Sequence, residues 1–288
     1  MKRIPRFLIL LFVLAPAAVR ADGADAAYED IRRTLGQVPT FLKDFPREAI
    51  AAVWDEYKGT ELNPNSALPG KVKELIGLAV AAQIPCRYCV YFHRSAAQLQ
   101  GATDAEIKEA LAIASLTRQW STVLNGMQVN EEGFRGELKR VFAYVVSPKA
   151  KAAKSAPITD AASAYADMER TLGLVPTFFK RFPSAGIAGA WREYKTIELG
   201  SKTALSGKHK ELIGLAVAAQ VPCRYCTWFH TEAAKLNGAT DTEVREAVAM
   251  AAITRHWSTF LNGMLYDETA FRREVDQIMA YLRRQASR

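Results

Sequence analysis

Two matching groups of residues in this chain have the types and spacing that redox chemistry needs. Each group is a Cys-x-x-Cys pair with a histidine four residues after the second cysteine and a glutamate 12 residues before the first. The chain has no other cysteines, so its thiols occur only in these groups. A cysteine pair that recurs with its proton-transferring neighbours indicates chemistry at two equivalent sites. The residues are Glu74, Cys86, Cys89 and His93 in the first group and Glu211, Cys223, Cys226 and His230 in the second.

The spacing fits one face of a helix. If Cys86 lies in the first turn, the unpaired backbone N–H groups and the positive end of the helix dipole favour its thiolate. Cys89 follows one turn later, with its Cα about 5 Å from that of Cys86, within the range for a disulfide. His93 is one further turn along the same face, where an imidazole can take up or return a proton near neutral pH.

Glu74 lies in a stretch that is otherwise apolar, Lys71–Gln83, which predicts a buried helix. A buried carboxylate needs a partner or becomes protonated. If this helix packs against the cysteine helix, Glu74 faces His93 and either orients the imidazole or relays a proton. The alternative is a surface glutamate beside Lys71 or Lys73; its recurrence as Glu211 favours the functional interpretation.

These elements belong to a unit that the chain contains twice. Ala27–Val145 aligns without gaps to Ala164–Leu282 at a constant offset of 137, with about 60% identity, so both copies must share one fold. The hydrophobic pattern is helical throughout, and no alternating β-type runs occur. We predict an all-α protein with helical domains at 22–145 and 164–288 and a flexible linker at 146–163. In the first copy we expect helices at about 27–35, 46–60, 71–83, 86–100, 103–124 and 131–145.

Residues 1–21 have the pattern of a secretory signal peptide: Lys2, Arg3 and Arg6, then an apolar core that is too short to span a bilayer, then Val19-Arg20-Ala21 as a cleavage site. Its removal lowers the formal charge from +8 to +4, because residues 1–21 contain four basic residues and no acid. We expect a periplasmic protein that no longer binds the membrane. The absence of a basic stripe with interleaved aromatic residues argues against nucleic-acid binding.

Other uses of a cysteine pair fit less well. A zinc site needs four ligands, and each group offers three on one helix face. Covalent haem needs a histidine directly after the second cysteine, where Val90 and Thr227 stand. A thioredoxin-type site follows a β-strand, and a structural disulfide gains little from closing so small a loop. We therefore expect neither a metal nor a cofactor.

With these residues in place, the sequence resembles the carboxymuconolactone decarboxylase family, in its alkylhydroperoxidase D-like branch. The matching pattern is the Glu…Cys-x-x-Cys…His group followed by Gly101-Ala102-Thr103-Asp104, repeated as Gly238-Ala239-Thr240-Asp241. The resemblance implies two tandem helical domains of that type and a thiol peroxidase. It implies that Cys89 and Cys226 attack the peroxide, that Cys86 and Cys223 resolve the product as a disulfide, and that the glutamates and histidines move protons. The family enzyme has a histidine inside the Cys-x-x-Cys, where this chain has Tyr88 and Tyr225.

The resemblance also bears on partners. The substrate is expected to be an organic hydroperoxide or hydrogen peroxide. An exported protein would need a thioredoxin-like or other dithiol reductant, because the family's lipoylated partner is cytoplasmic. A homo-oligomer is expected, a trimer of tandem chains being one such assembly. The alternatives are a thiol–disulfide exchange protein without peroxidase activity, a lyase, whose branch lacks the cysteine pair, and a non-catalytic module with permanently closed disulfides.

Overall fold

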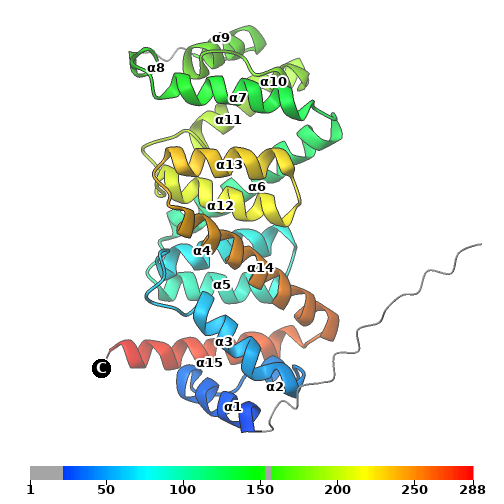
Figure 1. Cartoon of the computed structure of the whole chain (residues 1–288), viewed down its shortest axis with the longest axis vertical. Coiled ribbons are helices and arrows are strands. Elements are labelled where there is room, and N and C mark those ends of the chain that lie inside the picture. Colours follow the sequence, from blue (N-terminus) through cyan, green and yellow to red (C-terminus); the bar gives the residue numbers. More distant parts are fainter. Residues whose placement is uncertain (1–21, 153–156, 288) are drawn as a thin grey trace, which may run out of the picture. The chain divides into compact units, whose positions relative to one another are not determined.

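The computed structural model describes residues 22–152 and 157–287, so the expected signal peptide lies outside the described residues (Figure 1). All regular elements in the described ranges are helical, which confirms the all-α prediction. In the first copy they are α1 (Asp22–Leu35), α2 (Thr40–Lys43), the 3-10 helix η1 (Arg47–Ala49), α3 (Ile50–Thr60), α4 (Gly70–Gln83), α5 (Arg87–Leu99), α6 (Asp104–Gly126) and α7 (Glu131–Val145). They continue with α8 (Pro148–Ala152), α9 (Ala161–Leu172), α10 (Thr177–Arg181), α11 (Ser184–Ile197), α12 (Gly207–Gln220), α13 (Arg224–Leu236), α14 (Asp241–Met264) and α15 (Glu268–Ala286).

The chain divides into two compact units, one ending at Asp55 and one beginning at Glu56. In the first unit, α1 presents Ile31 as part of a small apolar core that also holds Ile50 and Trp54. The indole N–H of Trp54 donates to Asp30 at 2.7 Å, which satisfies the polar edge of a ring that is otherwise buried.

The second unit is built around α4 and α12, the equivalent helices of the two copies. Both are buried on nearly every side, as the continuous apolar sequence of α4 predicts. They pack against each other, and each also contacts both α6 and α14. The cysteine helix α5 lies on α4, and its equivalent α13 lies on α12 (Figure 1).

The two copies interlock in this second unit. The last helix of the second copy, α15, packs on α5 of the first, and α7 of the first copy packs on α13 of the second. Each cysteine helix is therefore covered by a helix from the other copy. The covering of one copy by the other could not be predicted from periodicity, which identifies a buried face but not the helix that covers it.

Local sequence signals explain where the helices begin and end. Thr103 caps α6 through a reciprocal hydrogen-bonded box with Glu106, as its sequence predicts, and Thr240 does the same for α14. Gly101 follows α5 with φ +79°, a conformation that favours glycine. One expectation differs from the structure: the segment 146–163, expected to be a flexible linker, contains α8 and the start of α9. Within the described ranges, no helix combines the length and apolarity that a membrane crossing requires.

Candidate active site

The two cysteine pairs lie at equivalent helix starts. Cys86 is the N-cap of α5, so it stands one residue before the helix and not in its first turn as predicted. Its sulfur accepts a hydrogen bond from the backbone N–H of Cys89 at 3.2 Å, and Cys223 accepts one from Cys226 at the same distance. Both pairs are disulfide-bonded, with Cα atoms 5.3 Å apart. Because the N–H donors point at the first sulfur of each pair, they stabilise that sulfur as a thiolate after reduction.

The glutamate and the histidine of each group meet, as expected from the packing of α4 on α5. His93 Nδ1 and Glu74 Oε2 are 2.8 Å apart, and His230 Nδ1 and Glu211 Oε2 are also 2.8 Å apart. All four side chains are buried. Glu74 and Glu211 are therefore not surface residues, and the alternative of a surface pair with lysine is wrong.

A glycine makes this meeting possible. Gly77 follows Glu74 by one turn of α4, and a Cβ at this position would lie closer than 3.0 Å to three atoms of the His93 ring. Gly214 has the same relation to His230. The imidazole rings thus lie directly against the backbone of α4 and α12, a close approach that only glycine permits.

A second carboxyl group completes each cluster. Glu61, just after α3, has its Oε1 3.9 Å from His93 Nδ1, and Glu198, just after α11, has its Oε1 3.7 Å from His230 Nδ1. The hydroxyl of Tyr57 donates to Glu61 at 3.2 Å. The carboxyl group of Glu198 is instead hydrogen-bonded to that of Glu211. No motif in the sequence indicates a role for Glu61 or Glu198.

The other side of each imidazole is held by the opposite copy. His93 Nε2 lies 3.3 Å from the hydroxyl of Thr254 on α14, and His230 Nε2 lies 3.3 Å from that of Thr117 on α6. The hydroxyl of Thr254 donates a hydrogen bond to the carbonyl of Met250 at 2.8 Å, so its oxygen accepts a hydrogen bond from the N–H group at His93 Nε2. In a neutral ring Nδ1 is then an acceptor, which requires Glu74 to be the protonated partner.

The electrostatics agree with that assignment. Burial raises the pKa of Glu74 to about 8 and that of Glu211 to about 8. Burial, then the charge of the neighbouring glutamate, raises the pKa of Glu61 and of Glu198 to about 8 as well. Burial also lowers the pKa of both histidines, so the rings are neutral near pH 7. Each cluster therefore holds exchangeable protons on its carboxyl groups at neutral pH, which suits a general acid.

Several further bonds between the copies are reciprocal. Tyr88 donates to the carbonyl of Tyr266 at 2.6 Å, and Tyr225 donates to that of Val129 at 2.6 Å. These tyrosines take the position of the family's extra histidine, and here they join the two copies. A carboxylate at an equivalent place on α6 and α14 also binds a loop of the other copy: Glu109 accepts from Leu205 N, and Glu246 accepts from the N–H groups of residues 67 and 68.

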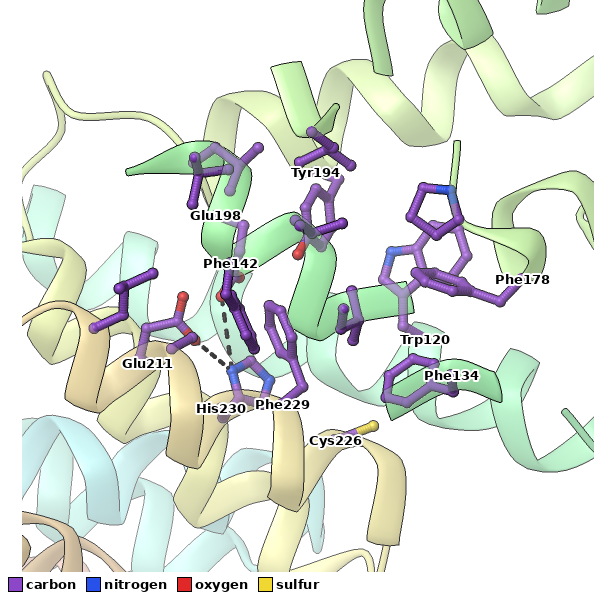
Figure 2. Close-up of a pocket in the computed structure, with 18 of the residues that line it drawn as sticks. Trp120, Phe134, Phe142, Phe178, Tyr194, Glu198, Glu211, Cys226, Phe229 and His230 are labelled. Carbon is purple, nitrogen blue, oxygen red and sulfur yellow. Dashed lines mark hydrogen bonds and ion pairs between the residues drawn. The ribbon is translucent and has the colours of Figure 1, made fainter. Parts of the chain in front are cut away.

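A pocket of about 350 Å³ opens beside the second cluster (Figure 2). Cys226, His230, Glu211 and Glu198 all line it, and Cys223 is not among its lining residues. In the view of Figure 2, Glu211 lies to the left of His230 and Glu198 lies above it. Trp120, Phe134 and Phe178 lie to the right, with the sulfur of Cys226 between His230 and these rings. Trp120 is one of these rings, and it is buried as well as lining the pocket.

Each cluster also has the composition of a metal site. The ligand atoms of Glu61, Glu74 and His93 lie within 4.8 Å of one another, as do those of the equivalent group in the second copy. One imidazole and two carboxylates could hold a divalent transition metal. In the sequence, only the cysteine motif suggests a zinc site, and no spacing pattern indicates the Glu–Glu–His group. The hydrogen bond between glutamate and histidine satisfies the same atoms in the metal-free arrangement.

The family of the chain is shown by comparison with known proteins. The model of the carboxymuconolactone decarboxylase family matches residues 48–132 and again residues 185–268, more than half of the chain. The chain belongs to the carboxymuconolactone decarboxylase family. Both matched segments of this family protein contain a complete set of the glutamates, cysteines, histidine and threonine described above. The predicted resemblance and the tandem duplication are thereby confirmed.

This carboxymuconolactone decarboxylase family protein is also similar to one protein in sequence and to one solved structure in fold. An uncharacterized protein of Cupriavidus necator is 47% identical over 49 residues, a match that spans 17% of the chain and 43% of that relative. A solved structure from Burkholderia xenovorans, described as a γ-carboxymuconolactone decarboxylase subunit, superposes with a TM-score of 0.55 at 19% identity. The superposition covers 91% of this chain and 98% of that one. At this identity the structural match supports the fold alone.

Proposed function

We propose that this protein is a thiol-dependent peroxidase with one redox site in each copy. The observation that carries the proposal is that Cys226 shares a pocket with His230 and Glu211, whereas its disulfide partner Cys223 does not line it. A peroxide in this pocket would meet Cys226 and a proton donor together. The alkylhydroperoxidase D-like pattern assigns the same role to the second cysteine of each pair, so Cys89 is its equivalent in the first copy.

The proposed cycle balances as follows. The thiolate of Cys226 attacks one peroxide oxygen, the O–O bond breaks, and the remaining oxygen leaves as an alcohol or water after taking a proton. The protonated carboxyl–imidazole cluster is placed to supply that proton. The sulfenic acid on Cys226 then reacts with the thiol of Cys223, which forms the disulfide and releases water. An external dithiol returns the pair to the reduced state.

Two N–H groups of the protein donate to the sulfur of Cys223, which supports different roles for the two cysteines of the pair. The Cys223 sulfur lies 3.2 Å from Cys226 N and 3.5 Å from the amide Nδ2 of Asn125, on α6 of the other copy. These donors make Cys223 the better leaving thiolate when a reductant attacks the disulfide. We propose a thioredoxin-like dithiol protein as that reductant, in the periplasm, on the basis of the signal-like residues 1–21.

The test is consumption of cumene hydroperoxide by the purified mature chain with dithiothreitol, in the presence of EDTA. We expect turnover by the wild type, about half of it in either Cys89→Ser or Cys226→Ser, and none in the double variant. EDTA separates this chemistry from a contribution of the Glu–Glu–His clusters as metal sites. No turnover by protein whose thiols are confirmed as reduced would refute the proposal and favour thiol–disulfide exchange, measured with a disulfide substrate.

A further inference from the structure

Each Glu–Glu–His cluster brings three potential metal ligands to one point. In the first copy, His93 Nδ1 lies 2.8 Å from Glu74 Oε2 and 3.9 Å from Glu61 Oε1. In the second copy, the corresponding distances from His230 Nδ1 are 2.8 Å and 3.7 Å. Bonds of about 2.0–2.2 Å to one shared ion place neighbouring ligand atoms about 2.8–3.6 Å apart. Small side-chain shifts therefore suffice to bring all three atoms onto one ion.

The histidine is held in the tautomer that metal binding requires. The N–H group at His93 Nε2 donates to the hydroxyl of Thr254, which in turn donates to the carbonyl of Met250. The lone pair at Nδ1 therefore faces the two glutamates. Histidines that bind metals usually donate their other ring N–H group in this way, because the bond fixes the orientation of the ring. His230 has the same relation to Thr117, at 3.3 Å.

The second glutamate of each cluster lies in a segment that a buried lysine holds in place. Lys73 Nζ donates to the backbone carbonyls of residues 60, 61 and 63, around Glu61. Lys210 Nζ donates to the carbonyls of residues 197 and 200, on either side of Glu198. Within the described ranges, the only ion-pair partner of the four cluster glutamates is the histidine of their own cluster. No lysine or arginine therefore occupies the place of a metal ion.

Charge and ligand type limit what these clusters can bind. A divalent ion and two carboxylates sum to zero charge, which suits a buried site. An imidazole together with carboxylates suits Mn²⁺, Fe²⁺, Co²⁺ or Zn²⁺ better than Mg²⁺, which is bound through oxygen ligands. In the second copy, Glu198, Glu211 and His230 all line the pocket of about 350 Å³, which offers an entry route and room for a water molecule as a further ligand.

We propose that each cluster binds one divalent first-row transition metal ion, with Nδ1 of the histidine and one oxygen of each glutamate as the protein ligands. Three protein ligands leave a position for solvent, which is typical of catalytic metal sites and not of structural ones. The inference does not rest on the proposed peroxidase activity, because neither cysteine of a pair is needed as a ligand. The ion takes the atoms of the glutamate–histidine hydrogen bond, so the metal-bound and the proton-donating forms of a cluster are alternatives.

The experiment uses the full mature chain with both disulfides closed, so that no thiol can bind metal. The protein is stripped with EDTA, freed of EDTA, and dialysed to equilibrium against Zn²⁺, Co²⁺ or Mg²⁺, and the bound metal is measured by mass spectrometry. We expect two ions of Zn²⁺ or of Co²⁺ per chain, one for each cluster, and no Mg²⁺. The absorption spectrum of the Co²⁺ form should lack the charge-transfer band that cysteine ligands produce.

Histidine variants assign the ions to the clusters. His230→Ala should leave one ion per chain and the double variant His93→Ala and His230→Ala none, whereas His256→Ala, at an exposed histidine outside both clusters, should retain two. Glu198→Gln keeps the size of the side chain and should weaken binding at the second site at least about tenfold, so it carries the test if a histidine variant fails to fold. No bound metal on the folded wild type, or two ions that remain on the double variant, would overturn the inference. The peroxidase assay, run in EDTA, is independent of this result.

Discussion

Gly214 provides the sharpest test of the site geometry. An added Cβ would lie closer than 3.0 Å to Cε1, Nδ1 and Nε2 of His230, whereas ordinary contacts begin at 3.4 Å. In Gly214→Ala the ring must withdraw by up to about 1 Å, a displacement that can cost on the order of 10²-fold in rate. The 2.8 Å bond between His230 and Glu211 would then stretch beyond hydrogen-bonding length, which disconnects the proton donor.

Stability gives a readout that does not depend on the proposed reaction. Forcing a methyl group against a packed ring costs about 1–3 kcal/mol, and this outweighs the gain of about 0.4–1 kcal/mol that a glycine-to-alanine change in a helix usually brings. Gly189→Ala in α11 is the matched control, because nothing lies within 4 Å of its added Cβ. We expect the two alanine variants to move the free energy of unfolding in opposite directions.

Urea unfolding and peroxide turnover, both in the Cys86→Ser and Cys89→Ser background, measure the two effects. Adding His230→Ala to Gly214→Ala removes the ring that the methyl group meets, so the double variant should lose less stability than the two single changes together, while remaining inactive. If Gly214→Ala is as stable and as active as Gly189→Ala, the close packing of His230 on α12 is wrong. The proton relay built on that packing is then wrong as well.

Three further predictions concern the groups around the clusters. Thr117→Val should lower turnover at the second site and shift its pH profile, although Thr117 belongs to the first copy; an unchanged pH profile would limit this residue to packing. The raised pKa of Glu198 means that the folded state binds more protons than the unfolded state. Wild-type stability should therefore fall as the pH rises from about 4.5 to about 8, and Glu198→Gln should reduce that fall in urea unfolding at pH 6 and pH 9. Lys210→Met should cost about 1–3 kcal/mol by the same measurement, because the buried Nζ donates to the carbonyls of Ile197 and Gly200; an unaffected free energy would show that these carbonyls are satisfied otherwise.

The residues that the sequence identified share a property: each stands out from its own segment. Cysteine occurs nowhere else in the chain, and Glu74 is an acid within an apolar helix. Their spacing also predicts their contacts, since α4 and α5 are consecutive helices joined by a short turn at Pro85. Local periodicity was therefore sufficient to place Glu74 against His93.

The missed residues lack such a contrast. Glu61 and Thr117 lie in ordinary amphipathic surroundings, and Gly77 resembles any small residue in a helix. Recurrence at the offset of 137 was a signal for all three, but about 60% of the aligned positions recur, so recurrence alone does not single them out. Thr117 reaches the second cluster from the first copy, a contact between residues 113 positions apart. Such a contact depends on how the two copies pack together. The hydrophobic pattern within one copy does not predict this packing.

The packing of the two copies explains what the duplication contributes to the sites. His93 depends on Thr254 and His230 depends on Thr117, so neither imidazole has its full set of partners within one copy. Two separate single-copy chains would have to associate before either site could form, and that association would weaken on dilution. A covalent link replaces it with an intramolecular step at an effective concentration on the order of millimolar. Completion of each site is thereby made independent of protein concentration, and the tyrosines of the two Cys-x-x-Cys runs, bonded across the copies, hold the arrangement at the cysteines themselves.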